Sequence, residues 1–428
     1  MTADEGVGVD GPGDAAVAVT VTRRAADKLR AGHLWVYRSD VQALGSAGGG
    51  DSGAAGEPDR GALVTVVDGR GVPLGTALYS AGSEIALRMV ARVAGLGRER
   101  YLKSIRERIA AAIALRDELS PISVGNDARR LIFSEADGLP GIVADQYGDI
   151  AVVQLLVQGT AKADVREVVG EAISGVFPEG TGTVWERTDS RIRQIEGLPL
   201  PPDGPIWAGG EARGECMFEI NGVRFHYDVG AGQKTGAFLD QRLNYAAAAA
   251  GAQGRALDVC TYQGGFALHL ARRCERVTGV DASRAALEVA DRNLELNREK
   301  VAAAVDWIEA DAFELMRAYQ EAGERFETIV LDPPAFAKSK RAAESALRGY
   351  KELNLRAMRM LSAGGRLVTC SCSHHVSPEE FLELLRAAAV DAGRRVQVLE
   401  SRGAAPDHPA MLALPETGYL KCVICRVE

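Results

Sequence analysis

The C-terminal half of the chain alternates short apolar runs with helical patterns, and this alternation is the strongest constraint on its fold. The apolar runs are short, β-branched and bounded by turn residues, which is typical of strands: ALDVC, RVTGVD, VDWIEA, TIVLD and RLVTCSCS. Helical patterns begin near Phe266, Ser283, Ala312 and Ala342, and another follows Ser377. Such an alternation predicts a mostly parallel sheet with helices on both faces, a Rossmann-like α/β fold. The segment PETGYLKCVICRV predicts a further strand that pairs antiparallel at the sheet edge.

Two further blocks precede this half. The first contains short strands separated by Gly, Pro and Asp clusters, which predicts a small β-barrel. The second opens with a helix from Arg98 to about Leu119 and continues with strands and a helix at about 161–175, which predicts a central α+β domain. A Pro- and Gly-rich linker then leads to a hairpin with Asn221-Gly222 at its turn. We expect a disordered tail and three domains, with these bounds: 1–15, 16–95, 97–200 and 210–428.

Composition narrows the class of protein. No run approaches the roughly 20 apolar residues of a membrane span, and the first residues do not resemble a secretory signal, so we expect a cytoplasmic protein without a membrane partner. Seven cysteines in 428 residues fit a reduced compartment. The net charge of −8 argues against a nucleic-acid partner, but residues 92–116 hold seven basic and two acidic side chains. This basic segment is either an RNA-binding face or the solvated side of a helix.

Chemistry-bearing residues follow the predicted strands, where ligands bind in such sheets. The first strand carries Asp258 and leads through Tyr262 to Gly264-Gly265, a turn without the G-x-G-x-x-G pattern that cradles a pyrophosphate. The second strand ends in Asp281 and the third leads to Asp311. Asp332 opens LDPPAFAKSK, where two prolines fix a rigid turn.

Together these strand ends predict an adenosine-type cofactor that lacks a pyrophosphate. We expect Asp281 to hold the ribose, Asp311 to face the adenine amino group, and the turn at Gly264 to lie against an amino-acid moiety. Asp258, Tyr262 and Asp332 complete this set of cofactor-binding candidates. S-adenosyl-L-methionine fits this description, whereas NAD fits it poorly.

The stretch GGRLVTCSCSHH offers several metal ligands or nucleophiles. On an extended strand, Cys370 and Cys372 point to the same face, about 6.5 Å apart; Cys372 lies nearer the carboxyl end, where ligands bind. Neither C-x₂-C nor H-x₃-H spacing is present, so we expect no metal here. Cys422-x-x-Cys425 has metal-ligand spacing but lies inside an alternating strand and favours a buried role. A packing role is also expected for Cys260 and Cys274.

The acid after the second strand and the Asp-Pro-Pro after the fourth resemble class I S-adenosylmethionine-dependent methyltransferases. VGAGQKTGAFLDQR, TYQGGFALH, DPPAFAKSK, RGYKELN and SCS are similar to one subfamily, ribosomal RNA large subunit methyltransferase I, whose members methylate C5 of a cytosine in 23S ribosomal RNA. GHLWVY and GTALYS resemble its N-terminal PUA domain, an RNA-binding barrel. The resemblance implies ribosomal RNA as partner, a homodimer, and a cofactor site lined by four residues of QKTGAFLDQR: Lys234, Thr235, Phe238 and Gln241.

The resemblance also implies that Cys372 of SCS is the catalytic thiol. A thiolate that adds to C6 makes C5 nucleophilic enough to accept a methyl group, and a base then removes the C5 proton. Asp332 is placed to hydrogen-bond N3 or to orient the exocyclic amine. Cys370 is either a core residue or a helper thiol in product release, and the proton-abstracting base, His374 and His375 stay unassigned.

Two other functions compete with this interpretation. Asp-Pro-Pro motifs also occur in methyltransferases that act on amino groups of bases, although here Ala335 holds the position of the stacking aromatic and Phe336 follows it. Such an enzyme would methylate a guanine or adenine nitrogen of ribosomal RNA. Alternatively, the barrel and the basic helix bind RNA while the C-terminal domain is catalytically idle.

Overall fold

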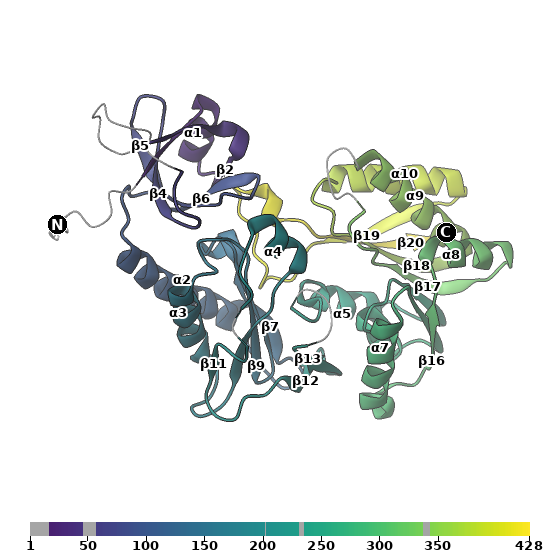
Figure 1. Cartoon of the computed structure of the whole chain (residues 1–428). Helices are drawn as coiled ribbons and strands as arrows, with labels where there is room; N and C mark the ends of the chain where they lie inside the picture. Colours follow the sequence, from purple (N-terminus) through teal and green to yellow (C-terminus); the bar gives the residue numbers. More distant parts are fainter. Residues whose placement is uncertain (1–16, 46–56, 202, 231–234, 337–342) are drawn as a thin grey trace, which may run out of the picture.

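The described part of the chain contains three large sheets in succession, one in each of the blocks expected from the sequence, and a two-stranded hairpin (Figure 1). The structure is a computed structural model that describes residues 17–45, 57–201, 203–230, 235–336 and 343–428. The predicted tail at 1–15 lies outside the described residues. No helix in the described part of the chain is long and apolar enough to span a membrane. All seven cysteines are free.

The N-terminal block forms a six-stranded sheet in the order β2-β6-β5-β4-β1-β3. Its neighbours are antiparallel except β1 and β4, which run parallel. The sequence interpretation missed α1, whose first turn is capped by the Thr22 hydroxyl, and β3. The elements are β1 (Ala18–Val21), α1 (Arg23–Arg30), β2 (Trp35–Tyr37), β3 (Val41–Gly45), β4 (Leu63–Val67), β5 (Pro73–Tyr79) and β6 (Ile85–Ala91).

The central block is a five-stranded sheet, β11-β10-β9-β8-β7, covered by α2 and α3 (Figure 1). The helix predicted from Arg98 to Leu119 is present with these bounds. The region interpreted as a linker carries a short strand, because Trp207 pairs with Val184 and extends the sheet by β11. A helix that the sequence interpretation missed, α4, ends where this region begins. The elements are α2 (Arg98–Leu119), β7 (Ala128–Phe133), β8 (Ile142–Tyr147), β9 (Ile150–Leu155), α3 (Ala163–Ser174), β10 (Thr183–Glu186), α4 (Ser190–Glu196) and β11 (Trp207–Ala208).

Several basic side chains of α2 form ion pairs or hydrogen bonds with other residues of the protein. Arg98 pairs with Asp164, Arg106 with Glu171, and both Nη groups of Arg108 donate to backbone carbonyls. Arg116 is fully buried. These bonds favour a structural role over an RNA-binding face for this part of the helix.

The C-terminal block is a seven-stranded sheet in the order β16-β15-β14-β17-β18-β20-β19. The first five strands are parallel, as predicted, and β20 is antiparallel to both of its neighbours. The predicted edge position of β20 is wrong, because β19 pairs along its outer side. The strands are β14 (Arg255–Val259), β15 (Arg276–Asp281), β16 (Ala304–Glu309), β17 (Phe326–Leu331), β18 (Leu361–Ser371), β19 (Val396–Arg402) and β20 (Lys421–Val427).

Helices cover both faces of this sheet. Side chains alternate between the faces along each strand, so each face carries apolar residues that the helices bury. Cys422 and Ile424 pack in the core beneath the first three helices, whereas Val423 and Cys425 pack in the core beneath the last three. Cys422 and Cys425 therefore lie on opposite faces of β20 and cannot share a metal ion. The helices are α5 (Arg242–Ala250), α6 (Gly265–Leu270), α7 (Arg284–Leu296), α8 (Ala312–Glu321), α9 (Ala343–Met360) and α10 (Pro378–Ala392).

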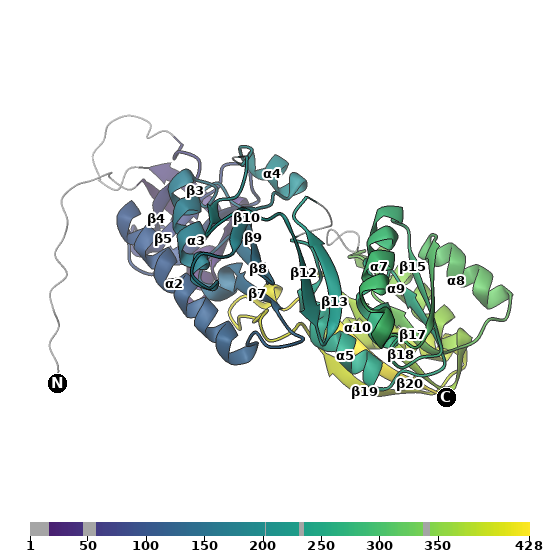
Figure 2. The same cartoon turned by 90° about the horizontal axis from the view of Figure 1, so that it is seen from below.

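A hairpin of β12 (Glu215–Ile220) and β13 (Val223–Asp228) stands between the central and C-terminal sheets (Figure 2). Phe218 and Phe225 of the hairpin share one apolar core with strands of both sheets. The hairpin thus packs against both the central and the C-terminal domain and connects their cores.

A second joint is the segment 403–420 between β19 and β20, which runs across to the N-terminal and central domains (Figure 1). Asp407 of this segment is fully buried. Its carboxylate accepts from the Arg130 backbone N–H at 3.0 Å, pairs with Arg242 at 3.4 Å and lies 3.0 Å from His408 Nδ1. Its carbonyl accepts two bonds from the buried Arg116 guanidinium, at 2.9 and 3.2 Å. Burial alone would raise the pKa of Asp407, but His408, Arg242 and the Arg130 N–H hold it at about 2.

We expect Asp407→Asn to lower the free energy of unfolding by about 3 kcal/mol near neutral pH, because it leaves buried guanidinium charge without its counter-ion. The native pKa of Asp407 lies below its usual value, so this stabilisation is present above about pH 4 and is lost as the pH falls towards 2. Thermal unfolding of wild type and variant across this range tests both statements. Asp391→Asn, which breaks a half-exposed ion pair with Lys351, serves as the control with a small effect. A difference between wild type and Asp407→Asn that stays constant down to low pH would contradict the assignment.

Candidate functional site

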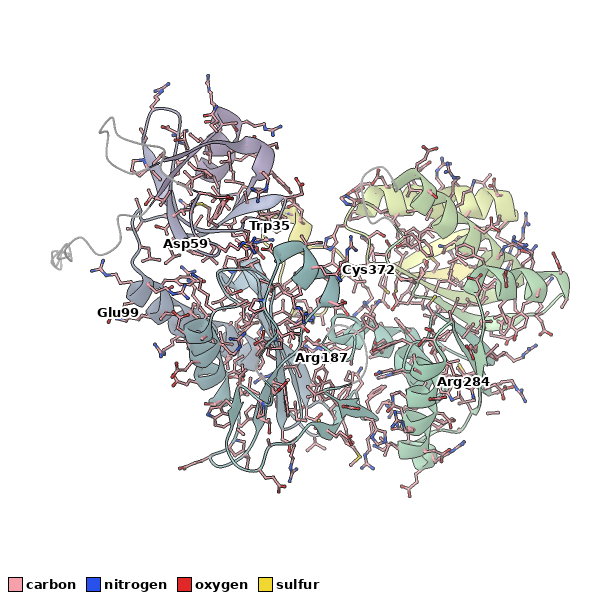
Figure 3. All side chains as sticks on the ribbon, viewed as in Figure 1. Trp35, Asp59, Glu99, Arg187, Arg284 and Cys372 are labelled. Carbon is pink, nitrogen blue, oxygen red and sulfur yellow. The ribbon has the colours of Figure 1, made fainter. Side chains whose placement is uncertain are left out.

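A pocket of about 300 Å³ opens at the carboxyl ends of the parallel strands. Its walls come from the turns after β14, β15, β16, β17 and β18, from the hairpin, and from the segment that precedes α5. Figure 3 shows Cys372 on the side of the C-terminal domain that faces the other two domains. Seven of the residues expected from the sequence line this pocket: Phe238, Gln241, Tyr262, Asp281, Asp311, Asp332 and Cys372.

The turn after β14 curls tightly under the pocket. Cys260 and Tyr262 have φ of 65° and 52°, and Gly264 has φ of 86°. Left-handed backbone is costly for residues other than glycine and gathers at functional sites. Gly264 itself is not part of the pocket lining, which includes its neighbour Gly265 instead.

Asp258 holds this turn from below and does not line the pocket. Its Oδ2 accepts from the Thr261 hydroxyl at 2.5 Å and from the Ala267 N–H at the start of α6 at 2.9 Å. Because the side chain is fully buried, desolvation raises its pKa to about 7. Asp258 thus acts on the shape of the turn.

Asp281 ends β15 and lies at the pocket wall. Its Oδ2 accepts from the Tyr262 N–H and its Oδ1 from the Ser283 N–H, both at 2.9 Å. This carboxylate fixes two turns, and each oxygen retains a lone pair for a ligand hydroxyl. Asp311 caps α8 through bonds from Phe313 and Glu314 N–H, and it is exposed at the rim.

Asp332 follows β17 and is held from the segment before α5. Gln241 Nε2 donates to Asp332 Oδ2 at 3.0 Å, and Asn244 Nδ2 donates to Gln241 Oε1 at 2.7 Å. This relay fixes both the amide orientation of Gln241 and the direction of the carboxylate. Pro333 and Pro334 continue the wall.

The stretch QKTGAFLDQR has several roles. Lys234 lies outside the described residues. Thr235 faces away from the pocket lining, because its hydroxyl donates to Asp145 of the central sheet at 2.5 Å. Phe238 does line the pocket and meets Tyr262 edge-on, with ring centroids 5.0 Å apart.

The two thiols of TCSCS have different environments. Cys370, inside β18, is fully buried, and burial together with Cys422 raises its pKa well above the ordinary range. Cys372 lies one residue beyond the strand end, is partly exposed and lines the pocket. Cys260 also lines the pocket, against our expectation of a purely packing residue, but burial and the carboxylates of Asp281 and Asp332 raise its pKa and keep it protonated.

Several pocket residues were not expected from the sequence. Asp240, between two candidates of the same segment, lines the pocket and accepts a bond from the Tyr419 hydroxyl. Leu420 and Phe336 complete the wall near Cys372, and Phe336 packs against Tyr350 with centroids 4.7 Å apart. Asp240 was discoverable, because it lies beside Gln241 in the same short stretch. Leu420 and Tyr419 carry no local signal, since only the return of the chain into the sheet brings them here.

His374 lies outside the pocket lining, at the turn after Cys372, where its Nδ1 is 3.1 Å from the Glu416 carbonyl and its ring lies against Tyr419. His375 is exposed.

The donor set of the pocket fits S-adenosyl-L-methionine. Aromatic and apolar side chains can enclose an adenine, Asp281 offers acceptors for ribose hydroxyls, and the turn at Gly265 forms part of the pocket wall.

Comparison with protein families gives two matches. Residues 19–92 match the PUA-like domain family, and residues 180–419 match the S-adenosylmethionine-dependent methyltransferase family. The second match spans more than half of the chain and includes every residue that lines the pocket except Leu420.

Curated relatives align with nearly the full length. The chain is 37% identical to ribosomal RNA large subunit methyltransferase I of Photobacterium profundum, with 94% of this chain and 96% of the relative covered. It is 36% identical to the protein of the same name from Klebsiella pneumoniae (92% and 94% covered) and 34% identical to that of Escherichia coli (92% and 95% covered).

Solved structures share the fold. An S-adenosylmethionine-dependent methyltransferase from Streptococcus mutans superposes with a TM-score of 0.76 at 17% identity, covering 96% of this chain and 100% of the other. A methyltransferase crystallised with SAH gives the same values.

The raised pKa of the buried Asp258 carboxyl predicts how the stability of the protein changes with pH. Its native pKa lies above the usual value, so the native state binds more protons than the unfolded chain and its contribution to stability falls as the pH rises from about 4 to about 7. Asp258→Asn removes this titration. We expect the stability of the variant relative to wild type to increase over the same range, measured by urea unfolding at several pH values. Asp306→Asn, at an exposed ion pair with Arg276, should show little such trend, and a flat difference for Asp258→Asn would refute the burial argument.

Proposed function

Because the chain belongs to the ribosomal RNA large subunit methyltransferase I family, we propose that it methylates C5 of a cytosine in 23S ribosomal RNA through a covalent adduct on Cys372. The chain is an S-adenosylmethionine-dependent ribosomal RNA methyltransferase. The choice of C5 and the role of each residue are our proposal. The observation that carries it is a partly exposed thiol in the same pocket as the cofactor-facing acids.

In this proposal the cofactor lies in the part of the pocket between the turn after β14 and the carboxylates that follow β15 and β16. Asp281 accepts from the ribose, Asp311 faces the adenine edge, and Phe238 and Tyr262 cover the ligand. S-adenosyl-L-methionine, when bound, supplies an activated methyl group to a carbon nucleophile.

Cys372 makes that carbon nucleophilic. Its thiolate adds to C6 of cytosine, the C5–C6 double bond gives up its electron pair, and C5 becomes enamine-like. After C5 has taken the methyl group, a base removes the C5 proton. The electron pair of that C–H bond restores the C5–C6 double bond and expels the Cys372 thiolate, so the thiol is regenerated.

Asp332 orients the base during this addition. Gln241 holds one of its carboxylate oxygens at 3.0 Å, and the side chain lines the pocket. A carboxylate in this position accepts a hydrogen bond from the exocyclic amine of cytosine. This bond fixes C6 relative to Cys372, and orientation of this kind contributes strongly to rate.

The competing N-methylation relies on an aromatic side chain that stacks on the target base after Asp-Pro-Pro. Phe336 is packed between Phe313 and Tyr350, with centroids at 5.8 and 4.7 Å. Its contacts support a wall residue, and the N-methylation of guanine or adenine remains an outcome of the experiment below.

Partners and location complete the proposal. The PUA-like domain would bind the ribosomal RNA substrate beside the pocket. We also propose the homodimer that the family resemblance implies, which light scattering coupled to size exclusion would test. An enzyme that acts on bacterial-type large-subunit RNA works where that RNA is made, which supports a cytoplasmic location.

Large-subunit RNA transcribed with 5-fluorocytidine tests the adduct. A fluorine at C5 cannot leave as a proton does, so the methylated adduct cannot eliminate the thiolate. We expect a denaturation-resistant protein–RNA species that requires S-adenosyl-L-methionine, is absent in Cys372→Ala, and persists in Cys260→Ala and Cys370→Ala. The labelled product on ordinary RNA should be 5-methylcytidine. A methylated guanosine or adenosine would refute the role of Cys372, and no transfer at all would favour an RNA-binding protein.

Asp332→Asn should lower the rate of methyl transfer by about 10²-fold, a typical loss for a group that positions and polarises the reacting base. The affinity for S-adenosyl-L-methionine, measured by calorimetry, should change by less than about threefold, because the lost bond is to the base. Glu324→Gln, at an exposed ion pair with Arg255, is the matched control. Equal losses of affinity and rate would instead assign Asp332 to the cofactor.

A further inference from the structure

A buried cation lies behind the pocket thiol. Lys421 is the first residue of β20 and is only 6% exposed. Its position follows from strand register, because Lys421 pairs with Ser371, the last residue of β18, one residue before Cys372. Its Nζ donates to the carbonyls of Ser373 and Tyr419, both at 2.7 Å. The first of these bonds fixes the chain directly after Cys372.

The partners of Lys421 do not neutralise it. Among the described residues, no carboxylate forms an ion pair with this ammonium. A buried charge without a counter-ion is costly, and a lysine in this state loses its proton more readily. Burial accordingly lowers the pKa of Lys421 to about 8, while negative charge on Cys372 acts in the opposite direction. The thiol is therefore an acidic group that the ammonium can stabilise, in addition to the Glu380 carboxyl.

Among the described residues, several hydroxyl and carboxyl groups also lie around Cys372 or Lys421. Tyr350 on α9 and Tyr419 before β20 both have pKa values raised by burial, so they remain neutral hydroxyls. The carboxyls of Asp240 and Asp332 line the same pocket and disfavour a thiolate. The charge of the Glu380 carboxyl on α10 acts to raise the pKa of Lys421. Its Oε2 accepts a hydrogen bond from the Ser377 N–H.

We propose that Lys421 is a positioning residue that holds Cys372 as a thiolate and fixes the turn that presents it to the pocket. The inference rests on the proposed function only for what the thiolate then attacks. Lys421 acts through Cys372, in the way that neighbouring cations activate thiols in other sites. Two carboxylates line the same pocket, and a cation beside the thiol offsets the negative charge that they contribute.

The rate of alkylation of Cys372 by iodoacetamide as a function of pH tests this directly, with the modified residue identified by mass spectrometry in the full-length protein. Only the thiolate reacts, so the profile reports the pKa of Cys372. In wild type we expect an apparent pKa below the ordinary value of about 8.5. Lys421→Met, which keeps the length and removes the charge, should raise it by about one unit and slow alkylation near neutral pH about tenfold.

Two variants separate charge from structure. Lys421→Arg keeps the charge and should retain most of the wild-type profile, whereas Lys351→Met removes a remote half-exposed lysine and should change nothing. If Lys421→Met fails to fold, the wild-type profile and Lys421→Arg still decide the matter. A wild-type Cys372 that titrates at or above the ordinary thiol pKa, or a profile unchanged in Lys421→Met, would overturn the inference.

The pKa of Cys372 and its dependence on Lys421 can be measured whichever base the enzyme methylates. A depressed pKa of Cys372 that depends on Lys421, combined with a product other than 5-methylcytidine, would leave this inference standing and remove the proposed function. A wild-type enzyme that forms 5-methylcytidine with an ordinary thiol pKa would do the reverse.

Discussion

The buried carboxylate of Asp407 is the interaction on which the arrangement of the domains depends. One of its oxygens accepts a hydrogen bond from the Arg130 backbone N–H of the central sheet and forms an ion pair with the Arg242 guanidinium of the C-terminal domain. Its backbone carbonyl accepts two hydrogen bonds from the Arg116 guanidinium of α2. One residue from the loop between the final two strands thus joins parts of the chain that are almost 300 positions apart in sequence.

The central domain also shapes the pocket wall. Arg130 donates two bonds to Asp145, at 2.6 and 2.9 Å, and Asp145 accepts from Thr235. Thr235 begins the short segment that supplies Phe238 and Gln241 to the pocket, and Gln241 in turn holds Asp332. The position of the Asp332 carboxylate therefore depends on side chains in two domains. A polar network of this kind is stabilising only when every member is satisfied.

The parallel sheet and the acids at its strand ends could be predicted from the sequence because both are local properties. Strand periodicity placed Asp281, Asp311 and Asp332 at one edge without knowledge of the pairing order. The limits of prediction are equally physical. The side chain of Asp258 accepts from the Ala267 N–H and the Thr261 hydroxyl beneath the turn, a role that its spacing from Gly264 does not distinguish from ligand binding. The position of β20, and with it Lys421 and Leu420, depends on which strands pair over a long separation, and one short pattern does not encode that choice.

The insertion of β20 between β18 and β19 has a consequence for the order of assembly. Among the strands that the structure describes, β19 pairs with β20 alone, which follows it in the chain. A growing polypeptide that has emerged as far as β19 therefore has no neighbour for that strand, and the segment around Asp407 has no fixed return point. The pocket reaches its complete form only when β20 has been synthesised and has docked, because Leu420 enters the wall with it. Folding of the earlier domains can precede this step, but a chain arrested before β20 would carry the cofactor-side acids without the completed surroundings of the thiol.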